Sequence, residues 1–478
     1  MKQRSLLLWL VLLLGHISYG QSREIHILAT NDMHANIDAF PQFAAIADSL
    51  RTLYPSLLVF SAGDNRTGNA INDKYEISSY PMVALMNQVG FNASTLGNHE
   101  FDVKSLPPLM GLSNFSYICA NALPSEESGL HIVPTQVFDV EGLKIGVIGI
   151  VQVNTQGRPD THPDNVKDVK FTLPMNTIAK YKDFSQQCDA TILLSHLGYE
   201  DDVKMAEEFP WIDLIIGGHT HFQLTADEPL HNGVLITQNK NALQSVTHIT
   251  LTLRNGRITD KKAEYIKVKN ITQKNRLVEA MVQFFNKNPY FERIIAEAAM
   301  PFTHKDELNF LMCDAYLEEG SGDISIVNNG GVRLESIAAG TITMREVLSM
   351  DPFNNLAVGM YLTGEEILKL LTTYSRGSLY HLPRVGGIIC EVTVDKDDQY
   401  KDRLKRVKLM TSDGKEFDPE KTYKVITNSY LASVCKPFLN KDYESLHIHT
   451  ADMLINYLKK QKTVSPTRRT ERLKIKEE

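Results

Sequence analysis

The sequence predicts two domains, an α/β layered domain followed by an α+β domain. With 478 residues, the chain is longer than a single hydrophobic core usually supports. From about 24 to 253, short apolar runs alternate with amphipathic stretches, which is typical of an α/β domain rather than a β-sandwich. Beyond about residue 301, clusters of Asn, Gly and Pro separate single helix and strand patterns, which favours an α+β domain.

In the first half, each expected element follows from its local pattern. Five apolar runs are expected to be strands, at 25–29, 57–61, 144–150, 190–194 and 214–216. Helices are expected at 41–53, where Pro41 suits the first turn, and at 174–187. The run 246–253, the turn at 254–257 and the strand after it predict a hairpin that closes the domain.

A connecting helix is expected over 275–299, with a break near Asn288-Pro289 because proline interrupts helical hydrogen bonding. In the second half, helices are expected at 307–318 and 364–373, and strands at 324–327, 388–394 and 423–427. The predicted domains therefore span 21–270 and 301–478, and 271–300 joins them.

The N-terminus is typical of a secretory signal over 1–20. Lys2 and Arg4 precede an apolar run at 6–14, and small residues flank a cleavage point after Gly20. The apolar run has about half of the roughly 20 residues that a membrane-spanning helix needs. We therefore expect an exported protein, periplasmic or extracellular, without stable membrane insertion.

Charge and cysteine content exclude other classes. The formal net charge of -7 is mild for this length and no basic block is present, so a nucleic-acid polymer is not the expected partner. The five cysteines are odd in number and widely spaced, without a Cys-x-x-Cys pair. Buried free thiols are expected rather than a disulfide framework, and export leaves one or two bridges open.

Five clusters of metal-ligand residues occur in order along the first half. They are Asp32 with His34, Asp64, Asn98, His196, and His219 with His221. Four of them directly follow a predicted strand, and open α/β sheets place their sites at the carboxyl ends of strands. The clusters offer only carboxylate, amide and imidazole ligands, which suit divalent ions such as Zn or Mn.

The arrangement favours two metal ions rather than one. Two ions about 3.5–4 Å apart share a bridging carboxylate, and Asp64, which stands alone after a strand, is the natural bridge. Asp32 with His34 can complete one site, and Asn98 with His196 the other. Taken singly, each histidine could instead be a core or loop residue, but the ordered set predicts metal binding.

The segment Gly97-Asn98-His99-Glu100-Phe101-Asp102 adds a candidate catalytic pair. His99 is adjacent to a ligand without being needed as one, so it can stabilise charge or donate a proton to a leaving oxygen. Asp102 could hold the imidazole in a cationic state. A helix cap is the alternative role for Asp102.

These motifs closely resemble the secreted 5'-nucleotidase family, the two-domain calcineurin-like metallophosphoesterases. The segments at 27–34, 97–102 and 217–221 carry the resemblance. It implies a four-layer α/β/β/α metallophosphoesterase domain and an α+β nucleotide-binding domain. It also implies that Asp32, His34, Asp64 and His221 bind one ion, that Asp64, Asn98, His196 and His219 bind the other, and that His99 and Asp102 form a catalytic dyad.

The second half resembles the nucleotide-binding domain of this family more loosely. The resemblance implies that Asn328 and Arg333 contact the substrate, that Phe353 and Tyr430 sandwich the base, and that Asn355 contacts the base. Rings on both sides suit any base, since every base has a π face.

Two positions depart from the family pattern. The aspartate that holds the ribose hydroxyls is missing after Tyr430, and Lys436 stands near its place. His304 stands where members often have a phosphate-binding arginine. We therefore expect weak discrimination between ribo- and deoxyribonucleotides and a preference for extra negative charge near Lys436, unless Asp442 or Glu444 fills the vacant place.

The expected function is that of an exported dinuclear hydrolase, a 5'-nucleotidase that releases phosphate from small-molecule nucleotides. Alternatives are a 2',3'-cyclic-nucleotide 2'-phosphodiesterase, a UDP-sugar hydrolase, a sulfur-ester hydrolase on the same scaffold, or a non-catalytic binding protein. The sequence leaves the oligomeric state open.

Overall fold

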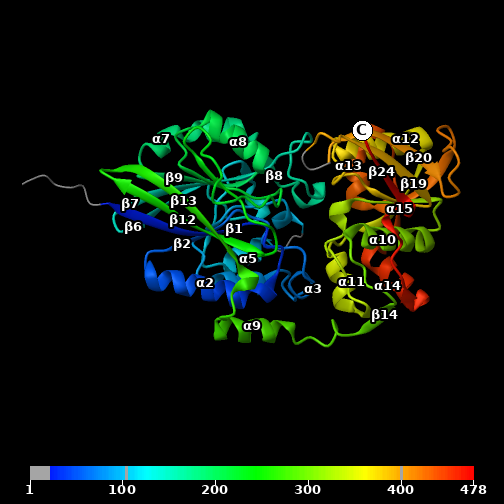
Figure 1. Cartoon of the computed structure of the whole chain (residues 1–478), viewed down its shortest axis with the longest axis horizontal. Coiled ribbons are helices and arrows are strands. Elements are labelled where there is room, and N and C mark those ends of the chain that lie inside the picture. The colour runs from blue at the N-terminus through cyan, green and yellow to red at the C-terminus, as the bar shows by residue number, and fades with distance from the viewer. Residues whose placement is uncertain (1–21, 103–105, 399–401) are drawn as a thin grey trace, which may run out of the picture.

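A computed structural model describes residues 22–102, 106–398 and 402–478, so the predicted signal at 1–20 lies outside the described residues. Two lobes lie side by side, and the chain passes between them through α9 (Arg276–Asn286) and the segment after it (Figure 1). Among the residues described, no helix has both the length and the apolar character needed to span a membrane.

Two packed sheets form the centre of the first domain. One has the order β13-β12-β1-β2-β3-β4 and the other the order β11-β10-β9-β7-β6. The strands of the first sheet are β1 (Arg23–Thr30), β2 (Leu58–Ser61), β3 (Ala93–Ser94), β4 (Ser116–Tyr117), β12 (Ser245–Arg254) and β13 (Arg257–Lys267). Those of the second are β6 (Thr135–Val140), β7 (Leu143–Val151), β9 (Ala190–His196), β10 (Leu214–Ile216) and β11 (Leu235–Thr237).

Side chains alternate between the two faces of β1, so this strand contributes to two buried clusters, one on each face of the first sheet. Ile25, Ile27 and Ala29 belong to a buried cluster that they share with β7, β9 and β10 of the second sheet. Leu28 points to the opposite face and joins the helices outside the first sheet. All five strands predicted in this half are present, each within one or two residues of its predicted limits.

Helices cover both outer faces, which gives the predicted α/β/β/α order of layers. The helices α2 (Phe40–Leu53) and α4 (Tyr80–Val89) pack on the first sheet, and α8 (Tyr199–Glu208) packs on the second. The helix predicted at 174–187 is three short pieces, α6 (Pro174–Ile178), η5 (Ala179–Tyr181) and α7 (Lys182–Ser185). Smaller elements are α3 (Ala70–Asp73), α5 (Leu106–Leu112), β5 (Ala122–Pro124) and β8 (Val169–Phe171).

The hairpin that closes the domain is present as predicted. β12 and β13 pair antiparallel down to Arg254 and Arg257. Asn255 and Gly256 both have positive φ, 52° and 70°, which a two-residue hairpin turn of this kind requires.

The predicted connecting helix over 271–300 is correct only for its first part. The side chain of Asn275 caps α9, and the helix ends at Asn286, before Pro289, as the sequence predicts. The rest is not helical, because Ile294–Ala298 forms strand β14. This strand pairs with β16 (Gly340–Thr343) and β23 (Thr463–Val464) of the second domain, and its residues Ile295, Ala296 and Ala298 are buried.

The second domain is an α+β unit around a five-stranded sheet of order β18-β15-β21-β17-β22. Its strands are β15 (Ile324–Val327), β17 (Leu356–Thr363), β18 (Arg384–Gly386), β21 (Thr422–Asn428) and β22 (Glu444–His449), with β19 (Ile388–Val394), β20 (Leu404–Thr411) and β24 (Leu473–Glu477) in a further sheet. The helices are α10 (Lys305–Gly320), α11 (Met344–Met350), α12 (Gly364–Ser375), α13 (Ser429–Leu439), α14 (Thr450–Gln461) and α15 (Arg469–Arg472). Both helices and all three strands predicted here are present.

One of the contacts between the two domains combines apolar and polar groups around α3 and α11. Ile71 of α3 and Val347 of α11 belong to one continuous cluster of buried residues. The backbone N–H of Ala70 donates to Ser349 Oγ at 3.3 Å. Lys74 Nζ donates to Asn354 Oδ1 at 2.6 Å, and this asparagine follows Phe353 of the predicted base slot. All five cysteines are free, and four of them are buried.

Candidate active site

The seven predicted metal ligands lie together at the carboxyl ends of the central strands. Asp32 follows β1, Asp64 follows β2, and His219 follows β10, while His196 is the last residue of β9 rather than the first after it. Asn98 follows β3. The two sheets end next to each other here, so ligands that are far apart in sequence reach the same place.

Five of these ligands have an unusual backbone conformation. The φ angles of Asp32, His34, Asp64, His219 and His221 are 48°, 44°, 51°, 76° and 56°. These values lie in the left-handed region, which residues other than glycine rarely adopt. Backbone hydrogen bonds from Asp32 to Gly63 O (2.9 Å) and from His34 to Asp64 O (3.0 Å) lock the two loops together. Such strain persists only where surrounding contacts fix it, and it is commonly found at functional sites.

Asp32, His34 and His221 form one group of potential ligands. His221 Nε2 lies 3.0 Å from His34 Nε2 and 3.3 Å from Asp32 Oδ1, while the His34 and Asp32 atoms are 3.9 Å apart. Ligands about 2.0–2.2 Å from a tetrahedral ion are about 3.3–3.6 Å from one another, so these atoms fit around one ion with small adjustments.

Asp64, His196 and His219 form a second group. His196 Nε2 lies 3.1 Å from Asp64 Oδ2, and His219 Nδ1 lies 3.1 Å from Asn98 Oδ1. Asp64 is also within ligand distance of His34. It therefore stands between the two groups, which is where a bridging carboxylate would have to be.

The surroundings of the imidazoles suit metal binding. Nδ1 of His196 donates to Ala62 O at 2.7 Å and Nδ1 of His34 to Thr67 O at 3.1 Å, so both rings turn Nε2 toward the carboxylates. Burial lowers the pKa of His196, but Asp64 and Asp32 outweigh burial and raise it to about 10. The buried carboxylates thus favour a cation at this nitrogen, a place that a divalent ion can take.

Two other ligands are held neutral, which is the form that binds metals. Burial and the neighbouring His196 lower the pKa of His219 to about 4. Burial and the charge of Arg333 lower the pKa of His34 well below its ordinary value. Burial raises the pKa of Asp64, but His196 and His99 outweigh burial and keep it well below its usual range.

His99 and Asp102 lie beside these groups on one short helical turn (η2, His99–Phe101). His99 Nδ1 and Asp102 Oδ2 are 2.7 Å apart, and Thr67 Oγ1 donates to the same carboxylate oxygen at 2.7 Å. Burial lowers the pKa of His99, but Asp102 and then Asp64 outweigh burial and raise it. Asp102 thus contacts the imidazole directly, and it lies at the C-terminal end of this turn rather than at its N-cap.

Glu100 is a buried residue of the candidate site that the sequence analysis did not identify. Its buried carboxylate accepts hydrogen bonds from the backbone N–H groups of Asp64 (2.8 Å), Asn65 (2.8 Å) and Gly97 (2.6 Å). It therefore holds the Asp64 loop against the Asn98 segment. Its position between the two dyad residues could have indicated that it belongs to the site. Its three backbone partners, in contrast, could not be predicted from the sequence.

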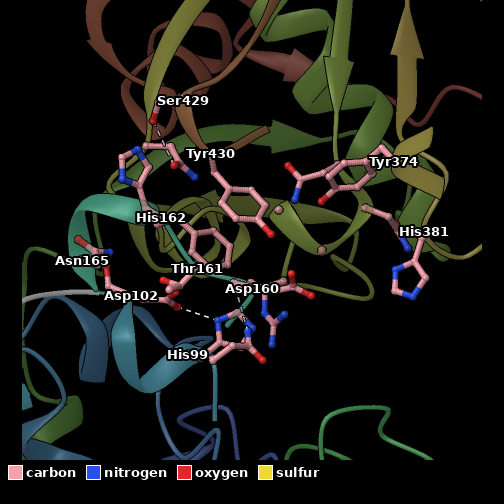
Figure 2. Close-up of a pocket in the computed structure, with 18 of the residues that line it drawn as sticks. His99, Asp102, Asp160, Thr161, His162, Asn165, Tyr374, His381, Ser429 and Tyr430 are labelled. Carbon is pink, nitrogen blue, oxygen red and sulfur yellow. Dashed lines mark hydrogen bonds and ion pairs between the residues drawn. The ribbon is translucent and has the colours of Figure 1, made fainter. Parts of the chain in front are cut away.

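A cavity of about 750 Å³ opens from this centre toward the second domain. The five predicted substrate residues all line it: Asn328, Arg333, Phe353, Asn355 and Tyr430. Figure 2 shows His99 on one side of the cavity and the ring of Tyr430 on the other. Phe353 lies against the dyad, with its ring centroid 5.9 Å from that of His99.

Arg333 reaches from the second domain to the metal ligands. Its Nη2 lies 2.7 Å from Nδ1 and 2.9 Å from Nε2 of His34. Asn328 is held in place by Asn428, whose Nδ2 donates to Asn328 Oδ1 at 2.8 Å. Asn355 accepts from Ser429 Oγ at 3.3 Å, which ties the Phe353 loop to the helix that carries Tyr430.

The structure does not place Lys436 at the cavity, where the expectation of its effect on the sugar required it. Leu431, Cys435 and Leu439 form the buried stripe of α13, so Lys436 lies on the solvent side of the helix. Its Nζ pairs with Asp442 Oδ1 at 2.7 Å, and it is not among the residues that line the cavity. Neither Asp442 nor Glu444 lines the cavity, so the alternative acids do not fill the sugar position either.

His304 also has a different role from the one its position suggested. Its Nδ1 accepts the backbone N–H of Asp306 at 3.1 Å, and Glu307 completes a capping box for α10. It does not line the cavity, so it cannot replace a phosphate-binding arginine.

The cavity has further lining residues that the sequence analysis did not identify. They include Asp160, Thr161, His162 and Asn165 from the first domain, and Tyr374, Arg376, Tyr380 and His381 from the second. Several are labelled in Figure 2. No motif marks them, because they become neighbours only when the domains pack together.

Comparisons with known proteins agree with this architecture. The family model described as calcineurin-like phosphoesterase matches residues 25–223, and the one described as 5'-nucleotidase, C-terminal domain, matches residues 296–440. The two matched segments contain all of the predicted metal, dyad and substrate residues.

Curated relatives match along most of the chain at low identity. The chain is 24% identical over 473 residues to the trifunctional nucleotide phosphoesterase protein YfkN of Bacillus subtilis, covering 86% of this chain but 32% of that protein. It thus spans about a third of this relative. It is 24% identical to protein UshA of Yersinia enterocolitica, with 91% of both chains covered.

A solved structure shows the same fold. The 5'-nucleotidase precursor from Thermus thermophilus aligns with a TM-score of 0.80 and 23% identity, covering 95% of this chain and 99% of that one. This alignment and the two family models agree on the identity of both domains and on their order along the chain. The chain therefore belongs to the 5'-nucleotidase family of two-domain calcineurin-like metallophosphoesterases, and it is a hydrolase.

Proposed function

We propose that this protein is an exported, metal-dependent 5'-nucleotidase that releases phosphate from nucleotides. Asp32, His34, Asp64 and His221 would hold one divalent ion, and Asp64, Asn98, His196 and His219 the other. When bound, such ions supply a water-derived nucleophile at neutral pH and neutralise charge on the phosphoryl group. The observation that carries the proposal is the dyad, which lines one cavity together with predicted metal ligands and two aromatic rings.

The remaining polar groups have complementary tasks in this proposal. His99, held by Asp102, carries a proton next to the phosphoryl site, where it can stabilise a non-bridging oxygen or protonate the leaving oxygen. Arg333 brings a second positive charge from the other domain to the same place. Glu100 keeps the two ligand loops in register, so that these groups stay oriented.

The aromatic residues of the cavity support a base-bearing substrate. Phe353 and Tyr430 offer aromatic faces that stack on any base, and Asn355 and Ser429 offer polar groups beside them. The relative YfkN is named a trifunctional nucleotide phosphoesterase, so the substrate panel should contain more than one kind of nucleotide phosphoester. Export is part of the proposal because the segment 1–20 has the pattern of a secretory signal.

The test is release of inorganic phosphate from AMP by protein loaded with Mn²⁺ or Zn²⁺. Exhaustive chelation and dialysis should abolish activity, and added metal should restore it. Parallel assays with 2',3'-cyclic AMP, UDP-glucose and a sulfate ester distinguish the alternatives. Full activity after chelation would exclude the metal-dependent mechanism, and faster turnover of another substrate in the panel would replace the proposed one.

A further inference from the structure

One acidic side chain in the cavity serves neither the metal ligands nor the dyad. Asp160 lines the cavity and its side chain is 19% exposed. In Figure 2 it lies between His99 and the ring of Tyr430. Asp160 and Tyr430 line the same cavity, and the backbone of Asp160 contacts Asn98, one of the predicted metal ligands. A sugar would occupy this stretch if phosphate lay at the metal ligands and the base on Tyr430.

The loop that carries Asp160 is fixed to the catalytic segment. Asn98 Nδ2 donates to the backbone O of Asp160 at 3.3 Å, and Thr161 Oγ1 donates to Phe101 O at 3.2 Å. Asn165 Nδ2 donates to the backbone O of Asp102 at 2.8 Å. These bonds prevent the loop from moving independently of the dyad, so Asp160 is preorganised relative to the reacting centre.

The carboxylate is oriented from both domains. Its Oδ1 accepts from Asn154 Nδ2 at 2.9 Å and from Arg376 Nη2 at 3.3 Å. Arg376 belongs to the second domain, at the C-terminal end of α12. Both of these hydrogen bonds within the described part of the chain are to Oδ1. Oδ2 of this cavity-lining side chain therefore remains open to a further donor.

We propose that Asp160 determines sugar specificity by accepting a hydrogen bond from a hydroxyl of the nucleotide sugar, and that Arg376 is a positioning residue that holds it. The inference rests on the proposed function, because it takes the substrate to be a nucleotide. It replaces the expectation of weak discrimination, which depended on Lys436. Since Arg376 and Asp160 lie on different domains, the sugar site is complete only when both domains are in contact.

The experiment is a kcat/KM panel with AMP, 2'-deoxy-AMP and 3'-deoxy-AMP on the full-length, metal-loaded protein. The parent should prefer AMP over at least one deoxy analogue by about tenfold or more, since hydrogen bonds to charged acceptors are the strong ones. Asp160→Asn keeps the shape but offers a neutral acceptor, so this ratio should fall by at least about fivefold. Equal rates for all three substrates in the parent would overturn the proposal, and so would an unchanged ratio in Asp160→Asn.

Three further variants distinguish a positioning role of Arg376 from a general loss of structure. Arg376→Gln should lower the kcat/KM preference for AMP over the deoxy analogue in the parent. In the Asp160→Asn background the same substitution should have no further effect. Arg376→Lys, which keeps the positive charge, should retain most of the preference. Lys436→Ala removes a cation of an exposed ion pair outside the cavity and should leave the ratio unchanged. If Lys436→Ala shifts the ratio as Asp160→Asn does, the assignment to Asp160 is wrong.

A binding measurement separates this inference from the proposed function. Calorimetry compares the Kd of adenosine with those of 2'-deoxyadenosine and 3'-deoxyadenosine, without any hydrolysis. Tighter binding of adenosine that depends on Asp160 would support the inference even if no nucleotide released phosphate, in which case the proposed function alone would fail. Equal Kd values for the three nucleosides would overturn the inference even if AMP were hydrolysed.

Discussion

Nδ1 of His99 and Oδ2 of Asp102 lie 2.7 Å apart across a single helical turn, with Thr67 Oγ1 on the same oxygen. The carboxylate therefore fixes both the orientation and the protonation of the imidazole. The ring in turn lies 5.9 Å from that of Phe353, so the dyad sits where the metal ligands meet the second domain. Our first prediction follows from this arrangement.

His99→Ala should lower kcat by about 10²- to 10⁴-fold, the usual contribution of a positioned acid or charge stabiliser, while metal content stays at the parent value. Asp102→Asn should have a smaller effect, since the imidazole remains. His131→Ala, on an exposed loop, is the control. Loss of a metal ion from His99→Ala, measured by elemental analysis, would show that His99 is a ligand instead.

Asp64→Asn and Asp32→Asn form a matched pair, because both positions have φ near +50° and both are buried. Asp64 lies between the two ligand groups, so its replacement should deplete both ions. Asp32 belongs to one group, so its replacement should deplete one. Metal analysis after dialysis checks this prediction, and two tightly bound ions in Asp64→Asn would contradict the bridging role.

Glu100→Gln should lower both the stability and the metal affinity of the site, although it replaces none of the predicted metal ligands. The new amide would place an N–H group against backbone N–H donors of Asp64, Asn65 or Gly97, leaving buried donors unpaired at a cost of about 1–3 kcal/mol. Metal affinity should fall by about 10- to 100-fold, as for other residues that orient ligands. Thermal denaturation measures the loss of stability and metal titration measures the loss of metal affinity. Glu127→Gln, at an exposed position, is the control. Parent-like values for Glu100→Gln would show that the loops do not depend on it.

Asp351 should make stability depend on pH. Burial raises the pKa of this carboxyl group to about 7, above its unfolded value near 3.8, because desolvation outweighs the hydrogen bond to Thr450 and the charge of Lys74. The folded state therefore holds the proton more tightly, and this stabilisation is lost as pH rises from about 4 through about 7. Asp351→Asn should be more stable than the parent at pH 8 and closer to it at pH 5.

Urea denaturation at the two pH values tests this prediction. Asp351 precedes the Phe353 loop and faces Lys74 of the first domain, so AMP hydrolysis in the same variant reports any displacement of the base slot. Asp397→Asn, at an exposed position, is the control. An identical pH dependence in parent and Asp351→Asn would show that Asp351 ionises normally in the folded protein.

Much of the fold could be predicted because local patterns carry it. Alternating apolar residues in β1 and the Asn255-Gly256 turn act over a few residues, and the sequence identified them correctly. The segment 294–298 was predicted as helix but is a strand, because its partners β16 and β23 come from about 45 and 170 residues further along the chain. Pairing with distant strands overrides local helical preference.

The sequence by itself determined the candidate metal ligands, the candidate dyad and the candidate base-stacking residues, because each belongs to a short segment directly after a strand or at the start of a helix. The tertiary structure alone decided the proposed sugar site. Asp160 and Arg376 are 216 positions apart, and only domain packing brings them together. Lys436 was misplaced for the same physical reason, since the buried stripe of α13 turns this side chain toward solvent and into an ion pair with Asp442.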